Sequence, residues 1–134
     1  MAVTFDRSRW PIVVATFEGD HDRETVEGFM DVMDELYARG ERFVTVYDIQ
    51  EYKGSDARFV KRVGQWYADR KREIEGLEAG MAMVIPSDTF RFMLSTAMLV
   101  ARFPENYAVV NSVAEGIAWA EERLRTEARR SEIG

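Results

Sequence analysis

Residues 81–85 read Met-Ala-Met-Val-Ile, a short run without a polar side chain. Such a run predicts a strand that is buried on both faces, as in a parallel sheet covered by helices. Further strands are predicted outward from it, at residues 43–49, 12–17 and 107–110, with a short one at residues 3–5. Because only a short turn at residues 8–11 joins the first two strands, we expect the first to lie antiparallel at an edge of the sheet.

Amphipathic helices are predicted between these strands. Over residues 22–39, apolar side chains recur at the spacing of one buried helix face, and Gly40 follows where a helix-ending glycine belongs. The apolar positions are Val26, Phe29, Met30, Met33, Leu36 and Tyr37. Further helices are predicted over residues 56–76, 87–103 and 112–125, the last with a Ser112–Glu115 capping box and followed by a frayed tail.

The resulting order ββαβαβαβα is typical of an α/β domain with a five-stranded, mixed, mostly parallel sheet and four helices. The 134 residues suffice for a single domain, whose core we place at about residues 3–126. No stretch approaches the roughly 20 apolar residues of a membrane span, so we expect a cytoplasmic protein without one.

Composition removes several classes of function. The chain has no cysteine and one histidine, His21, which excludes thiol catalysis and any site built from two histidines. We interpret the acids beside His21 as compensating the dipole of the following helix, and we predict neither a metal nor a cofactor site. The net charge of −6 argues against nucleic-acid binding, which needs a positive surface.

The element order resembles the STAS domain, the fold of bacterial anti-sigma-factor antagonists, and more closely the small stand-alone STAS-like proteins grouped with CRAL-TRIO-type domains. The segments that carry the resemblance are Arg9-Trp10-Pro11, residues 39–43, Gln65-Trp66, residues 84–87, Ala114-Glu115 and Ala118-Trp119-Ala120. The resemblance implies a non-catalytic, regulatory protein-interaction module.

A candidate switch or ligand site consists of Asp48, Ser55 and Asp56. Antagonist STAS domains carry a phosphorylatable serine or threonine at the start of the second helix, directly after an aspartate. Counted from Asp48, that aspartate falls on Asp56 and the acceptor on Ala57, while Ser55 precedes both. Alternatively, Ser55 or Asp56 caps the helix and Asp48 anchors a loop.

A candidate interface consists of Phe92, Leu99 and Phe103, which share one stripe of the predicted helix 87–103, opposite its core face. A helix that covers a sheet should be polar on that side, so the stripe predicts a homodimer or another protein partner. Trp119 is a candidate extension of this surface. Alternatively, the stripe packs against other parts of the same chain.

Two other functions remain open at this stage. Seven methionines among the apolar residues offer an adaptable lining, so a carrier of a small apolar ligand in a CRAL-TRIO-like pocket is the alternative to the interaction module. An enzyme that uses Asp48 or Asp56 is the weakest reading, because no nucleophile–base pair can be assembled from the spacing. We therefore expect no enzymatic activity.

Overall fold

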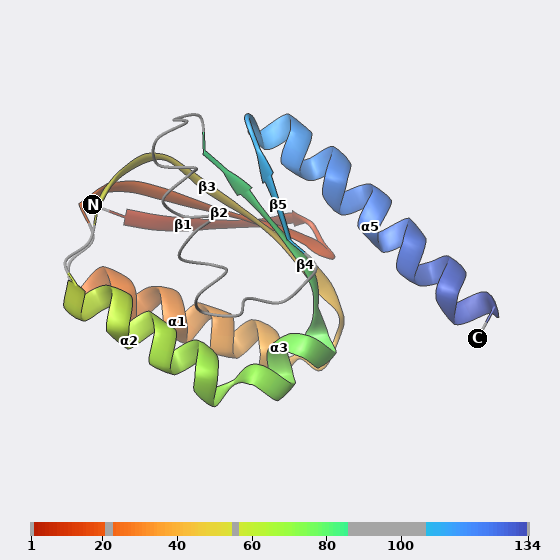
Figure 1. Ribbon diagram of the computed structural model, residues 1–134, viewed down its shortest axis with the longest axis horizontal. Coiled ribbons are helices and arrows are strands. Elements are labelled where there is room, and N and C mark those ends of the chain that lie inside the picture. Colours follow the sequence, from red (N-terminus) through yellow and green to blue (C-terminus); the bar gives the residue numbers. More distant parts are fainter. Residues whose placement is uncertain (1, 21–22, 55–56, 86–106, 134) are drawn as a thin grey trace.

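The computed structural model describes residues 2–20, 23–54, 57–85 and 107–133, and at its centre is one sheet with strand order β1-β2-β3-β4-β5 (Figure 1). The strands are β1 (Ala2–Arg9), β2 (Ile12–Asp20), β3 (Phe43–Gly54), β4 (Glu78–Val84) and β5 (Tyr107–Val110). β1 runs antiparallel to β2, and all the other neighbouring pairs are parallel. The predicted mixed sheet with an antiparallel edge strand is confirmed.

Helices cover both faces of the sheet and make three layers. The described residues contain α1 (Arg23–Ala38), α2 (Ala57–Asp69), α3 (Lys71–Leu77) and α5 (Val113–Ile133). α1, α2 and α3 lie on one face, and α5 lies on the other (Figure 1). Right-handed crossovers between strands that follow one another in space place their helices on the same face. α5 comes after the last strand, so no crossover holds it to that side.

Several boundaries differ from those predicted. The helix expected over residues 56–76 is broken at Arg70, whose φ of −113° and ψ of 20° are not helical, and this separates α2 from α3. β4 begins at Glu78 rather than Met81, and β3 continues past residue 49 to Gly54. The predicted helix 87–103 lies outside the described residues.

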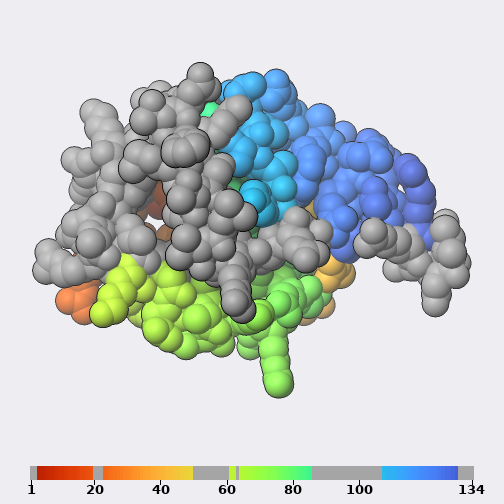
Figure 2. Space-filling view, in the orientation of Figure 1, coloured from red at the N-terminus to blue at the C-terminus, as the bar shows by residue number. Residues whose placement is uncertain are grey.

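α5 is longer than predicted, since it continues to Ile133 instead of giving way to a frayed tail after residue 125. Ion pairs one turn apart support these later turns, from Arg123 to Glu127 and from Arg125 to Glu122. In the space-filling view the blue turns of α5 lie on the right-hand side of the molecule (Figure 2).

The core has two parts, one on each face of the sheet. All six apolar positions predicted for the first helix are buried in α1, and they pack with Phe43, Tyr47 and Trp66 between the sheet and α1–α3. The second part lies between the sheet and α5. Its buried members are Ile12, Val14, Val44, Val46, Ala79, Ala82, Val84 and Ala120.

α5 approaches the sheet closely at two glycines. A Cβ added at Gly116 would lie 2.8 Å from Cγ1 of Val46, and one at Gly80 would lie 2.7 Å from Cη2 of Trp119. Only glycine fits at either point without a shift of the neighbouring side chain. The predicted cap is also present, because the Glu115 N–H donates to Ser112 Oγ at 3.2 Å; the carboxylate of Glu115 accepts from the N–H of Asn111 at 3.0 Å.

Candidate functional site

Glu78 is a buried carboxylic acid at the point where α3 ends and β4 begins. Its N–H caps α3 by donating to the Ile74 carbonyl, and the residue is 6% exposed. Glu78 is in register with Phe43, and the register shifts by one residue directly after this pair. Residues paired in register share a face of a sheet, so the side chain of Glu78 enters the core beneath α1 and α3.

Three hydroxyl groups converge on this carboxylate. Tyr47 and Thr45 donate to Oε1 of Glu78 at 3.0 and 3.2 Å, and Tyr37 donates to Oε2 at 3.5 Å. Thr45 and Tyr47 alternate along β3 and therefore point to the same face, while Tyr37 comes from the last turn of α1. All three partners are neutral, so they solvate the carboxylate without balancing its charge.

Burial controls protonation in this cluster, which we call the Glu78 cluster (Tyr37, Thr45, Tyr47, Glu78). Loss of water disfavours the charged carboxylate and raises the pKa of Glu78 from 4.5 to about 7, against the opposing effect of the three hydroxyls. Burial and the nearby Glu78 charge raise the pKa of Tyr37 and of Tyr47 above the usual value. Both tyrosines thus keep their protons, and Glu78 is the member that titrates near neutral pH.

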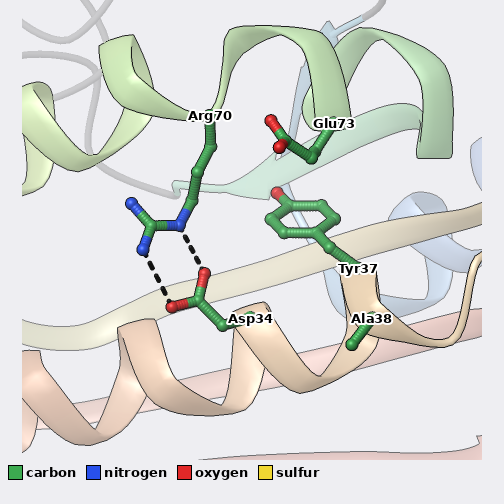
Figure 3. A pocket seen from close by; sticks show the side chains of 5 residues that line it. All are labelled: Asp34, Tyr37, Ala38, Arg70 and Glu73. Atoms are coloured by element: carbon green, nitrogen blue, oxygen red, sulfur yellow. Dashed lines mark hydrogen bonds and ion pairs between the residues drawn. The ribbon is translucent and has the colours of Figure 1, made fainter.

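A shallow hollow lies on the surface above this cluster, lined by Asp34, Tyr37, Ala38, Arg70 and Glu73 (Figure 3). Arg70 and Asp34 form a two-pronged ion pair across it, with Nη2 3.0 Å from Oδ2, and the Trp66 indole N–H donates to the same carboxylate at 3.2 Å. Tyr37 both lines the hollow and donates to Glu78. It is therefore the residue that links the surface to the buried acid.

Asp48 lies further along β3, near the middle of the strand, and is half-buried. Asp48 is in register with Thr16 on β2 and Val84 on β4. The ladder with β4 stops at this pair, whereas the ladder with β2 continues to Asp20 and Gly54. Asp48 therefore marks the point beyond which β4 no longer pairs with β3, while β2 and β3 stay paired and carry the chain on toward α2.

Comparisons with known proteins identify the fold. No family model and no curated protein matches the chain. Among solved structures, it is similar to an uncharacterised protein of the DUF3478 family from Shewanella loihica PV-4, described as having a SpoIIAA-like fold. The identity is 14%, over 89% of this chain and 92% of that one, with a TM-score of 0.70. The chain has a SpoIIAA-like fold.

Two further structures agree with this assignment. The anti-sigma factor antagonist SpoIIAA in its unphosphorylated form is 18% identical, over 92% of this chain and 98% of that one, with a TM-score of 0.62. The Bacillus cell fate determinant SpoIIAA in its phosphorylated form is 19% identical, over 87% and 97%, with a TM-score of 0.58. The prediction of a STAS-like fold is thereby confirmed.

Within this SpoIIAA-like fold, the residues expected to form a switch are described only in part. α2 begins at Ala57, the position on which the count from Asp48 places the acceptor. Ser55 and Asp56, which directly precede Ala57, lie outside the described residues.

The candidate interface residues Phe92, Leu99 and Phe103 also lie outside the described residues. Trp119 is half-buried on α5, with its ring over Gly80, whereas Asp48 is level with Val84 at the other end of β4. The SpoIIAA-like fold therefore does not bring Trp119 and Asp48 together.

The described residues of this SpoIIAA-like fold were also compared with the requirements of a metal site and of a membrane-spanning helix. No group of three or more metal-ligating side chains is placed to hold an ion within the described ranges. Over the same residues, no helix is long and apolar enough to cross a membrane.

The Glu78 cluster is not among the sites predicted from the sequence. Glu78 stands directly before the apolar run that begins at Ala79 and directly after Leu77. An acid inside an apolar stretch is the one sequence signal that points to a buried carboxylate at this position.

Proposed function

We propose that the chain is a non-catalytic regulatory module that acts by binding a protein partner, in the manner of an anti-sigma factor antagonist. The observation that carries this proposal is the fold, because the similarity spans nearly the whole of the antagonist SpoIIAA as well as most of this chain. That antagonist occurs in unphosphorylated and phosphorylated forms, as expected of a regulator.

We place the partner surface at the junction of β3 and α2, around Asp48, Ser55 and Asp56. The continued pairing of β2 with β3 beyond Asp48 brings the chain to this junction, at the carboxyl ends of the parallel strands. Open α/β sheets bind their ligands at that end. Ala57 has no hydroxyl group, so binding here does not depend on phosphorylation of residue 57.

Charge reversal at this junction is expected to abolish binding of the partner. The chain and its Asp56→Arg variant would each be purified by affinity from their own cells and weighed by native mass spectrometry. We expect a stoichiometric second protein with the wild type and none with Asp56→Arg. A partner surface complementary to Asp56 is positively charged, so it repels an arginine at this position. Asp31→Arg, at an exposed position on α1, is the matched control and should keep the partner.

Circular dichroism would verify that both variants are folded. Retention of the partner by a folded Asp56→Arg variant would place the binding surface elsewhere. A wild type that carries no second protein would contradict the interaction module itself.

We further propose that the module forms a homodimer through Phe92, Leu99 and Phe103, as the sequence pattern predicts. Phe92→Asp is then expected to change the mass seen by native mass spectrometry from two chains to one, because a charge in an apolar interface is costly. Lys61→Asp, at an exposed position on α2, should remain a dimer. A wild-type monomer, or loss of folding in Phe92→Asp, would reject the dimer interface.

A further inference from the structure

The Glu78 cluster fixes the short backbone segment between α3 and β4, on the face of the sheet that α1–α3 cover. Residues 76–79, which we call the Glu78 junction, join the end of α3 to the start of β4. The side chain of Glu78 ties the junction to α1 through Tyr37 and to β3 through Thr45 and Tyr47. These three bonds therefore hold the junction in place from the side of α1 and β3.

The same stretch is held from the opposite side by two guanidinium groups. Arg42 donates to the carbonyl of Gly76, and Nε of Arg123 donates to the carbonyl of Ala79 at 2.8 Å. Both arginines also form ion pairs with Glu127 of α5. The backbone on either side of Glu78 is thus bonded directly to the network that fastens α5 to the sheet.

Among the charged groups that the structure describes around the cluster, none forms an ion pair with the Glu78 carboxylate. Asp34 and Glu73 line the hollow outside Tyr37, where Arg70 is paired with Asp34. Tyr67 of α2 carries a buried hydroxyl next to Tyr47. On the side of α5, the ion pairs of Arg42 and Arg123 are with Glu127. Within the described residues, no ion pair reaches Glu78.

We propose that Glu78 makes the junction a proton-operated coupling between the two helical layers, in which loss of the Glu78 proton loosens residues 76–79 and thereby weakens the attachment of α5. A protonated carboxyl is satisfied by hydroxyl partners, whereas a buried carboxylate without a cation is strongly disfavoured and is relieved by moving toward water. The raised pKa of Glu78 puts this change in the neutral range.

Nuclear magnetic resonance can follow the acid and the helix in the same sample. The carboxyl carbon of Glu78 reports its protonation, and the indole N–H of Trp119 reports α5, because the Trp119 ring rests on Gly80 next to the junction. Between pH 5.5 and 8.5 we expect both signals to shift with one midpoint close to pH 7. In Glu78→Gln the shift of the Trp119 signal should be lost.

Three further variants separate this coupling from other causes. Glu73→Gln, on the exposed surface of α3, and His21→Asn, which removes the single histidine, should keep the Trp119 response. Arg123→Met removes the bond to the Ala79 carbonyl, so Glu78 should still titrate while the pH-dependent shift of the Trp119 signal becomes smaller. A Trp119 response that survives in Glu78→Gln, or a wild-type Trp119 signal that ignores the titration of Glu78, would overturn the proposal.

Discussion

Replacing Trp66 with alanine is expected to lower the free energy of unfolding by about 3–5 kcal/mol. Trp66 is 1% exposed, and its ring centroid lies 6.1 Å from those of Phe29 and Tyr37 and 5.1 Å from that of Tyr67. The variant loses these contacts, leaves a cavity at the centre of the first core, and removes the indole N–H that bonds Asp34. Urea denaturation followed by circular dichroism measures the difference.

Trp10→Ala is the matched control for this prediction. Trp10 is only half-buried, with its ring stacked on Phe43 and the Arg39 guanidinium 3.9 Å above it. Its removal is expected to lower the free energy of unfolding clearly less than Trp66→Ala does, because part of the Trp10 ring is already in contact with water. Equal losses in the two variants would show that Trp66 does not hold the centre of the core.

The second prediction concerns the dependence of stability on pH. Glu78 has a pKa of about 7 in the folded protein against 4.5 for the exposed side chain, so the folded state binds the proton more tightly. The resulting stabilisation is complete below pH 4.5 and is lost as the pH rises through 7. We expect the free energy of unfolding of the wild type to fall by about 3 kcal/mol across this window from the titration of Glu78.

Glu78→Gln should flatten this slope and should be more stable than the wild type at pH 8, since its amide stays neutral and bonds to the same hydroxyls. The measurement is a series of urea denaturation curves at pH 5, 6, 7 and 8. In Glu73→Gln, at an exposed position on α3, the free energy of unfolding should change with pH as it does in the wild type. Parallel curves for Glu78→Gln and the wild type would contradict the raised pKa.

Features set by local sequence could be predicted well. The buried face of α1 follows from apolar residues at helical spacing, and Gly40 ends the helix region with a φ of +69°, which glycine adopts easily. The parallel pairing of β2, β3, β4 and β5 follows from the alternation of apolar strands with amphipathic helices. Each of these patterns is formed by residues of the same helix or strand, or by residues directly next to it.

Features set by distant partners could not be predicted in this way. Glu78 is buried because it meets Tyr37, 41 residues before it, and Tyr47, 31 residues before it. Arg70, where α2 and α3 separate, is bonded to Asp34, 36 residues away. Trp66 stands at the edge of its apolar stripe in sequence, yet Tyr37 and Asp34 of α1 enclose it in the fold. Spacing along one helix carries no information about these contacts.

The neighbour-to-neighbour strand order also has a consequence for the chain during its synthesis. Each strand can pair with the one made just before it, and α1–α3 cover the first face of the sheet along the way. The second face, with Val44, Val46 and Val84, is covered by α5, whose first residue is Val113. A nascent chain halted on the ribosome before that point lacks the cover of α5 over those valines, which makes it a target for chaperones and for aggregation.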